Sequence, residues 1–130
     1  MIAVDTNVIV RLFTGDNARQ TAVASGLLDR EELYVATTVV LEAEWVLRKV
    51  YHLDSNRIVE ALRAFVSLPQ VRLEAPERVF YALRLIGEGL DFADALHRAA
   101  AIEADCEQLA TFDRDFARRA TGEEAAVRLL

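Results

Sequence analysis

The sequence has few of the residues that several classes of protein need. It contains a single cysteine, Cys106, which excludes an intrachain disulfide and a metal site built from several cysteines. We expect Cys106 to be a small buried side chain. No run of about 18 apolar residues occurs, and the N-terminus lacks the basic start and unbroken apolar stretch of a signal peptide. These absences predict a cytoplasmic protein with no membrane-spanning helix.

Positive charge is also scarce. The net charge is −6, and Lys49 is the only lysine, which argues against broad electrostatic binding to nucleic acid. Two features weaken that argument, because carboxylates gathered around a divalent cation are locally neutralised and the planar fork of arginine suits phosphate. The P-loop pattern Gly-x-x-x-x-Gly-Lys is absent as well, which excludes a P-loop nucleotide-binding enzyme.

What is present is a regular alternation of short apolar strands and amphipathic helices. The length of 130 residues predicts one domain, residues 1–130. The expected strands are 2–4, 33–36, 71–73, 108–112 and 126–130, and the expected helices are 8–13, 18–28, 39–51, 55–67, 76–86, 91–106 and 114–119. We expect Asn7 to cap the first helix and Thr37 or Thr38 the third. This order predicts an α/β protein with a parallel sheet covered on both faces, whose site lies beyond the carboxyl ends of its strands.

Two aspartates follow strands directly, at the position where such a site is expected. Asp5 ends the first strand, and Asp113 ends the strand before the last helix. A charge beside an apolar strand is costly unless it is paired or binds metal. The ordinary alternative is a turn residue or a helix cap. Thr111, at the end of the same strand as Asp113, could orient a carboxylate or a water, although a strand threonine usually does neither.

The third helix carries two glutamates with different surroundings. Glu42 has apolar neighbours at helical spacing and no basic partner, so it requires an explanation. Glu44 has Arg48 four residues on, which predicts an ordinary surface ion pair. We therefore select Glu42 as the candidate site residue.

Three further aspartates begin helices in the C-terminal part of the chain. Asp91 and Asp94 are three residues apart and lie on one side of the first turn of their helix. The ordinary alternatives are an N-cap role for Asp91 and an ion pair with Arg98 for Asp94. Asp115 follows Asp113 in the first turn of the next helix, where an acid also suits the helix dipole.

Carboxylates brought together repel one another unless a cation holds them. A set of oxygen ligands favours Mg²⁺ or Mn²⁺ over zinc. Such ions activate water and stabilise charge on phosphate oxygens. The pattern therefore predicts metal-dependent phosphodiester hydrolysis.

Four segments of the sequence, in this order, resemble the motifs of PIN-domain ribonucleases, and of the VapC toxins of toxin–antitoxin pairs in particular. They are Ile2-Ala3-Val4-Asp5-Thr6-Asn7, the helix segment from Glu42 to Trp45, Asp91-Phe92-Ala93-Asp94-Ala95, and Thr111-Phe112-Asp113-Arg114-Asp115-Phe116. The resemblance implies a three-layer α/β/α fold with a central parallel sheet. It also implies a Mg²⁺-dependent endoribonuclease (Mn²⁺ being the other candidate ion) that cleaves tRNA or rRNA, forms a homodimer and is inhibited by a VapB-type antitoxin. The implied metal-binding and catalytic acids are Asp5, Glu42, Asp94 and Asp113, supported by Asp91 and Asp115.

Other functions fit parts of the pattern. A haloacid-dehalogenase-like phosphatase also begins with an aspartate after a strand, but its second aspartate would fall at Asn7 and its lysine would have to be Lys49. A non-catalytic PIN-fold scaffold would keep the fold without the chemistry. A nuclease for DNA would use the same acids, but the chain lacks obvious insertions for gripping a flap.

Overall fold

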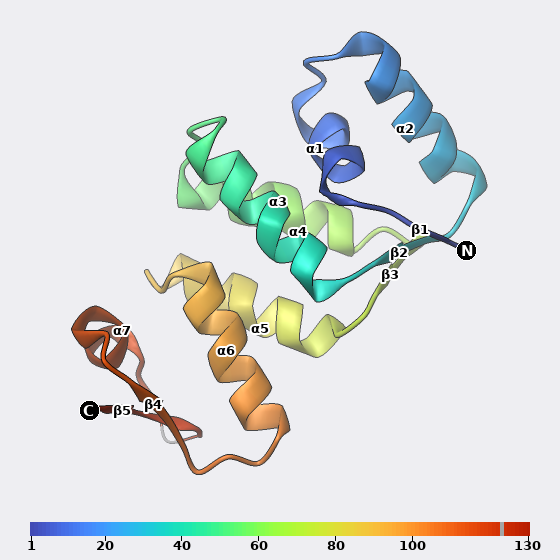
Figure 1. The fold of residues 1–130 in the computed structure, drawn as a ribbon. Helices are drawn as coiled ribbons and strands as arrows, with labels where there is room; N and C mark the ends of the chain where they lie inside the picture. Colours follow the sequence, from blue (N-terminus) through green and yellow to red (C-terminus); the bar gives the residue numbers. More distant parts are fainter. Residues whose placement is uncertain (123) are drawn as a thin grey trace. The chain divides into compact units, whose positions relative to one another are not determined.

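The computed structural model describes residues 1–122 and 124–130, and its contacts divide the chain into two compact units, Met1–Pro76 and Glu77–Leu130. Each unit is a small parallel α/β assembly (Figure 1). The predicted alternation of strands and helices is therefore confirmed. Every paired strand in the described residues runs parallel to its neighbour. No helix in the described part of the chain has the length and apolar character needed to cross a membrane.

The first unit is built on a three-stranded sheet in the order β1-β2-β3. A pair of helices connects each strand to the next, and α1 packs against both α2 and α3. The elements are β1 (Ile2–Ala3), α1 (Thr6–Thr14), α2 (Ala18–Arg30), β2 (Leu33–Val35), α3 (Thr37–Lys49), α4 (Ser55–Val66) and β3 (Val71–Leu73). The register pairs Ile2 with Leu33 and Leu33 with Val71.

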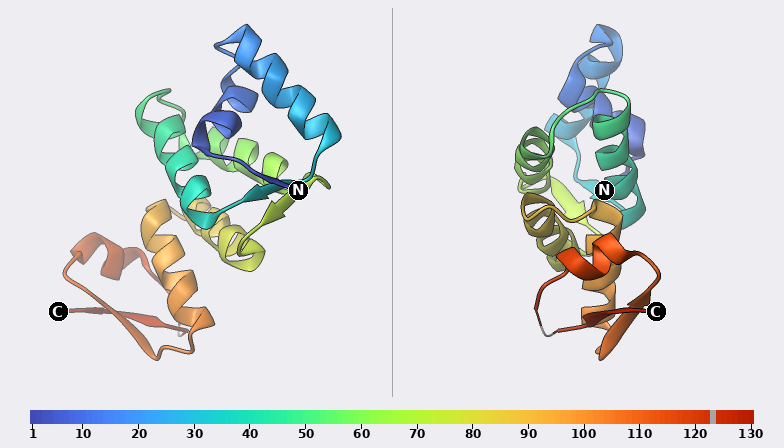
Figure 2. Two further views of the ribbon diagram at one scale, coloured as in Figure 1. Left: turned by 45° about the vertical axis from the view of Figure 1, so that its right-hand side comes forward. Right: turned by 90° about the vertical axis from the view of Figure 1, so that its left-hand side faces the viewer.

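The second unit contains two parallel strands, β4 and β5, joined by a short helix that packs against both (Figure 2). Its elements are α5 (Pro76–Gly87), α6 (Phe92–Glu103), β4 (Gln108–Thr111), α7 (Arg114–Arg119) and β5 (Ala126–Leu129). Pro76 begins α5 as predicted, where its missing amide hydrogen costs no helix bond.

The core face of α4 recurs at helical spacing, as its apolar pattern predicts. On α4 the buried side chains are Ile58, Leu62, Phe65 and Val66. In the second unit Phe92, Ala95 and Ala99 of α6 are buried. The small alanines allow α6 to lie close to β4, which it contacts.

Two predicted helix starts, at residues 8 and 39, are each two residues too late. The first helix begins at Thr6, and its N-cap is Asp5, whose Oδ1 accepts from the Val8 amide at 3.4 Å. The third helix begins at Thr37 after Ala36, which provides no side-chain cap. Cys106 was expected to be buried, but it is exposed just beyond the end of α6.

Candidate active site

The two strand-end aspartates occupy equivalent positions in the two units. Asp5 lies between β1 and α1, and Asp113 lies between β4 and α7. Each caps the helix that follows it. The Oδ1 atom of Asp113 accepts from the Phe116 amide at 3.0 Å, as Oδ1 of Asp5 does from Val8. The other oxygen of each carboxylate has no hydrogen-bond partner among the described residues, so it can serve as a metal ligand.

The turn after β4 is held by a second hydrogen bond. The backbone amide of Asp113 donates to Oγ1 of Thr111 at 3.0 Å. Thr111 therefore fixes the backbone from which the Asp113 carboxylate projects. Phe112, between them, is 82% exposed.

Helix α6 presents the second pair of acids in the second unit. Asp91 is its N-cap and accepts from the Asp94 amide at 3.1 Å, so the cap role considered from the sequence is present. The pKa of Asp94 is raised by its partial burial and by the nearby negative charges of Asp91 and Asp113, against a smaller opposing effect of His97. These three acids therefore share one electrostatic environment, in which a cation would be stabilised.

The ion pair of Asp94 with Arg98, the ordinary alternative considered from the sequence, is not found among the described residues. Arg98 is instead buried, at 2% exposure, and its Nη2 donates to the carbonyl oxygens of Gly122 and Glu124 at 3.3 and 3.2 Å. Its Nε has no hydrogen-bond partner among the described residues. Gly122 has φ +104°, and a Cβ there would lie 3.1 Å from Nη2. Arg98 thus ties α6 to the loop before β5 and forms no ion pair with Asp94 in the part of the chain that the structure describes.

The glutamates of α3 differ from the prediction in their burial. Glu44 is bonded to Arg48 at 2.7 Å as predicted, but it is 5% exposed rather than a surface residue. Glu42 is exposed, and within the described residues its side chain forms no ion pair or hydrogen bond. Its apolar neighbour Trp45 is 55% exposed. Trp45, on the face that carries Glu42, is therefore not part of the core.

Asp115 is an exposed acid that already has a partner. It pairs with Arg118 one turn along α7 at 3.0 Å, and both side chains are largely in solvent. Asp115 lies in the first turn of α7, where a negative charge interacts favourably with the helix dipole.

No three His, Cys, Asp or Glu side chains converge closely enough to form a metal centre within the residues that the structure describes. Asp5 and Glu42 belong to the first unit, and Asp91, Asp94, Asp113 and Asp115 belong to the second. The donor chemistry nevertheless fits a hard divalent cation, because the candidates provide only oxygen.

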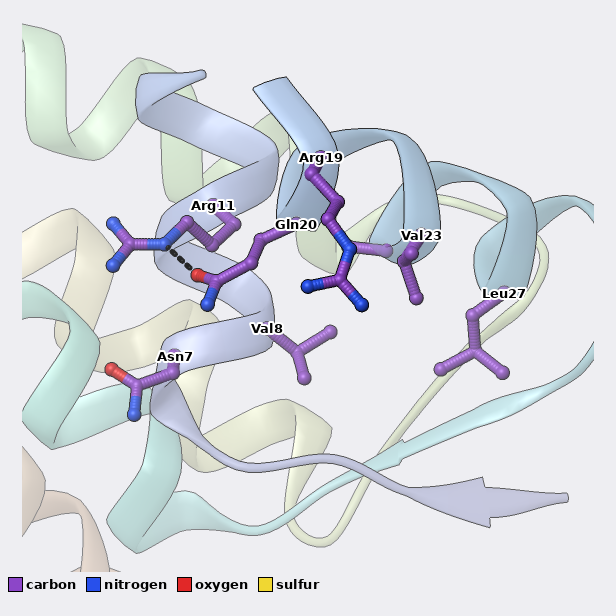
Figure 3. A pocket seen from close by; sticks show the side chains of 8 residues that line it. Asn7, Val8, Arg11, Arg19, Gln20, Val23 and Leu27 are labelled. Atoms are coloured by element: carbon purple, nitrogen blue, oxygen red, sulfur yellow. Dashed lines mark hydrogen bonds between the residues drawn. The ribbon is translucent and has the colours of Figure 1, made fainter. Parts of the chain in front are cut away.

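A groove of ≈ 470 Å³ runs between α1 and α2 (Figure 3). Its lining combines Asn7, Val8, Arg11, Arg19, Gln20, Val23, Ala24 and Leu27. Arg11 donates to Gln20 across the groove at 2.6 Å and also pairs with Asp16 at 2.7 Å. The hydroxyl of Tyr51 lowers the pKa of Asp16, as do Thr14 and Arg11. Both helices contribute apolar and basic side chains to the groove, and its lining residue Asn7 is two positions after Asp5 in the sequence.

Sequence reasoning missed two contributors to this geometry. One is Arg98, described above. The other is Glu74, which follows β3 and accepts a hydrogen bond from the backbone amide of Thr37 at 3.1 Å. Both interactions join residues far apart in the sequence, so no local pattern indicates them.

No curated protein shows significant similarity to the chain. Two solved structures resemble it at low identity. One is the VapC20 toxin of Mycobacterium tuberculosis, which cleaves the sarcin-ricin loop (20% identity, TM-score 0.45, covering 95% of this chain and 98% of that one). The other is VapBC2 of Rickettsia felis bound to a promoter DNA fragment (18% identity, TM-score 0.41, covering 99% and 98%).

The sequence model of the PIN domain family matches residues 2–122 of the chain. This match covers all four sequence motifs and confirms the predicted three-layer α/β/α fold class. It also separates the chain from the haloacid-dehalogenase-like phosphatases considered from the sequence. The chain therefore belongs to the PIN domain family, a family of nucleases.

Proposed function

We propose that this protein is a metal-dependent endoribonuclease whose core acids are Asp5, Glu42, Asp94 and Asp113. The observation that carries the proposal is a repeated arrangement. Each unit has an aspartate that leaves a parallel strand and begins a helix, together with a second acid on another helix of the same unit. In a PIN domain, strand-end acids of this kind belong at the ligand-binding edge of the sheet.

The residues fit a magnesium or manganese ion. The strand-end aspartates each keep one carboxylate oxygen free of hydrogen bonds, and Glu42 has no competing basic partner among the described residues. The pKa of Asp94 is raised because burial and the nearby negative charges of Asp91 and Asp113 disfavour its charged form. A bound divalent ion would compensate this charge, make water a better nucleophile and stabilise charge on the phosphate.

The supporting acids have smaller roles in this proposal. Asp91 holds the first turn of α6 through the Asp94 amide and adds negative charge beside Asp94. Asp115 lies near the strand-end acid Asp113 in sequence, but its carboxylate is already paired with Arg118. We therefore expect Asp91 to matter more than Asp115.

We further propose that the protein is the toxin of a VapBC pair and acts on tRNA or rRNA in the cytoplasm. This proposal rests on family membership and on the four motifs, because toxins of this type are compact PIN domains. It predicts that expression of the protein alone arrests growth and that Asp94→Asn does not. Equal toxicity of the two proteins would contradict it.

The groove between α1 and α2 is our proposed contact for a VapB-type antitoxin. Val23 is 66% exposed and Arg19 has no ion pair among the described residues, so the groove suits an amphipathic segment with apolar and acidic side chains. The substitution Val23→Glu should abolish antitoxin binding in a pull-down while RNA cleavage persists. Loss of both activities, or of neither, would contradict this location.

We also propose a homodimer that uses the exposed apolar residues at the C-terminal part of α3. Trp45 and Val50 are both more than half exposed. The apolar face of α4, by contrast, is buried in the core. Sedimentation of the parent and of Val50→Glu should show a dimer and a monomer, respectively. A monomeric parent would contradict the proposal.

Cleavage of total RNA tests the activity directly. We expect discrete cuts with Mg²⁺, none with chelator, and none with Asp5→Asn. The matched control is Asp29→Asn, because Asp29 is exposed at the end of α2 and is not among the candidate acids. If the parent binds no metal and cuts nothing, the protein is a PIN-fold scaffold instead.

A further inference from the structure

The helix that carries Glu42 begins without a cap of its own. The N-cap side chains of α1, α2, α4, α6 and α7 are Asp or Asn, and each accepts a hydrogen bond from an amide of its own helix. At α3 the N-cap is Ala36, which has the extended backbone of a cap (φ −69°, ψ 151°) but no side-chain acceptor. The first turn of α3 therefore lacks the local interaction that fixes the others.

Glu74 supplies this interaction from the neighbouring strand. Its backbone amide donates to the carbonyl of Val35 at 3.0 Å, which extends the β2–β3 pairing by one residue. Its Oε2 accepts from the Thr37 amide, the first of the helix, at 3.1 Å. A carboxylate at this point also interacts favourably with the helix dipole. Glu74 thus caps a helix that begins 37 residues earlier in the sequence.

Glu42 depends on this helix for its position. Its exposed side chain has no hydrogen bond or ion pair among the described residues, so only the backbone of α3 places it. The first turn of α3 lies between the capped amide of Thr37 and Glu42. Fraying of that turn would move Glu42 relative to Asp5 at the end of β1.

We propose that Glu74 is a positioning residue for Glu42. It acts by capping α3 from the end of β3. This inference rests on the proposed function, because the position of Glu42 matters only if Glu42 binds the metal. Glu74 itself binds neither the metal nor the RNA.

A second-site rescue tests the proposal. Glu74→Ala removes the remote cap, and Ala36→Ser introduces a local cap at a residue whose backbone already suits one. The parent, both single variants, the double variant and the control Glu60→Ala are compared. Glu60 is an exposed glutamate on α4 with no recorded partner among the described residues.

Two measurements are made on each protein. Amide hydrogen exchange reports the opening of residues 37–40, and calorimetry reports Mn²⁺ affinity. In Glu74→Ala we expect exchange at these amides to accelerate about 5-fold, as for loss of a typical cap, and Mn²⁺ affinity to fall about 10-fold, as for loss of a positioning contact. Ala36→Ser in the double variant should restore both, and Glu60→Ala should change neither.

The outcomes separate this inference from the proposed function. If Ala36→Ser restores slow exchange but not Mn²⁺ affinity, Glu74 contacts the metal itself and the positioning role is overturned. Unchanged exchange and affinity in Glu74→Ala, with a parent that binds Mn²⁺, overturn the inference alone. A parent that binds no Mn²⁺ overturns the proposed function as well, whatever the exchange data show.

Discussion

The two acid-bearing helices, α3 and α6, are fixed at their first turns in opposite ways. Helix α6 is capped locally, by Asp91 on the amide of Asp94. Helix α3 is capped from another strand, by Glu74 on the amide of Thr37. Farther along, α6 is tied to a distant loop by Arg98, whereas α3 relies on its own Glu44–Arg48 pair. Each helix therefore has one short-range and one long-range contact. In α6 the short-range contact is at the first turn, whereas in α3 the first turn has the long-range contact.

The largest expected effect comes from the acids themselves, which should behave alike in both units despite these different supports. Asp5→Asn and Asp94→Asn should each lower RNA cleavage by more than about 100-fold, because loss of a metal ligand costs at least as much as loss of its supporting contacts. Single-turnover cleavage with the Asp29→Asn control measures this. A variant of either unit that keeps full activity would remove that unit from the site.

Arg98 offers the sharpest test of the long-range contact in the second unit. Arg98→Ala should lower the free energy of unfolding by about 1–3 kcal/mol, because two carbonyl oxygens lose their donor. Denaturant unfolding monitored by circular dichroism gives the value. Parent-like stability would show that the loop before β5 is held in another way.

Glu44 tests the short-range contact in the first unit. Glu44→Gln keeps the shape but weakens the bond to Arg48, which is about one-third exposed. We expect a loss of about 1 kcal/mol in stability and little change in RNA cleavage. A loss of cleavage as large as that of Glu42→Gln would show that Glu44 is the site glutamate.

The smallest effect concerns the pH dependence of stability in the metal-free protein. Because the pKa of Asp94 is raised in the folded state, the folded protein binds more protons than the unfolded chain between the ordinary value of 3.8 and the raised value. Stability from this group is therefore lost as pH rises through that window and stays lost above it. Asp94→Asn should melt slightly above the parent at neutral pH, and the difference should disappear below pH 3.8.

Thermal melts of both proteins across this pH range in chelator provide the check. Asp5→Asn, which can still cap α1, should likewise melt no lower than the parent. A marked loss of stability in either variant would mean that the carboxylate supports the fold.

Much of this arrangement could be predicted from the sequence because it is local. Apolar periodicity and punctuation placed all the strands and helices, and helix 114–119 was located to the residue. The N-cap role of Asp91 is such a local feature, because its side chain accepts from the amide three residues on. Both partners of such an interaction lie close together in the sequence, so a local pattern can reveal it.

What the sequence did not reveal depends on tertiary contacts. The pairing of Asp94 with Arg98 satisfied the helical spacing, but Arg98 finds carbonyl acceptors 24 and 26 residues away. Trp45 lies on the same face of α3 as Glu42 and is exposed. The apolar pattern of the helix gives no sign of this exposure. Glu44 was expected at the surface because it has a basic partner, but the spacing that pairs it with Arg48 does not determine which side of α3 faces the core.

The central proposal is that Asp5 and Asp94 serve the same metal-dependent activity, and Mn²⁺ binding to a double-mutant cycle tests it most directly. The four proteins are the parent, Asp5→Asn, Asp94→Asn and the variant with both changes. If the acids act together, each single change removes most of the affinity and the second change adds far less than the first. Two independent losses, each removing its own bound ion, would show separate sites and contradict the account.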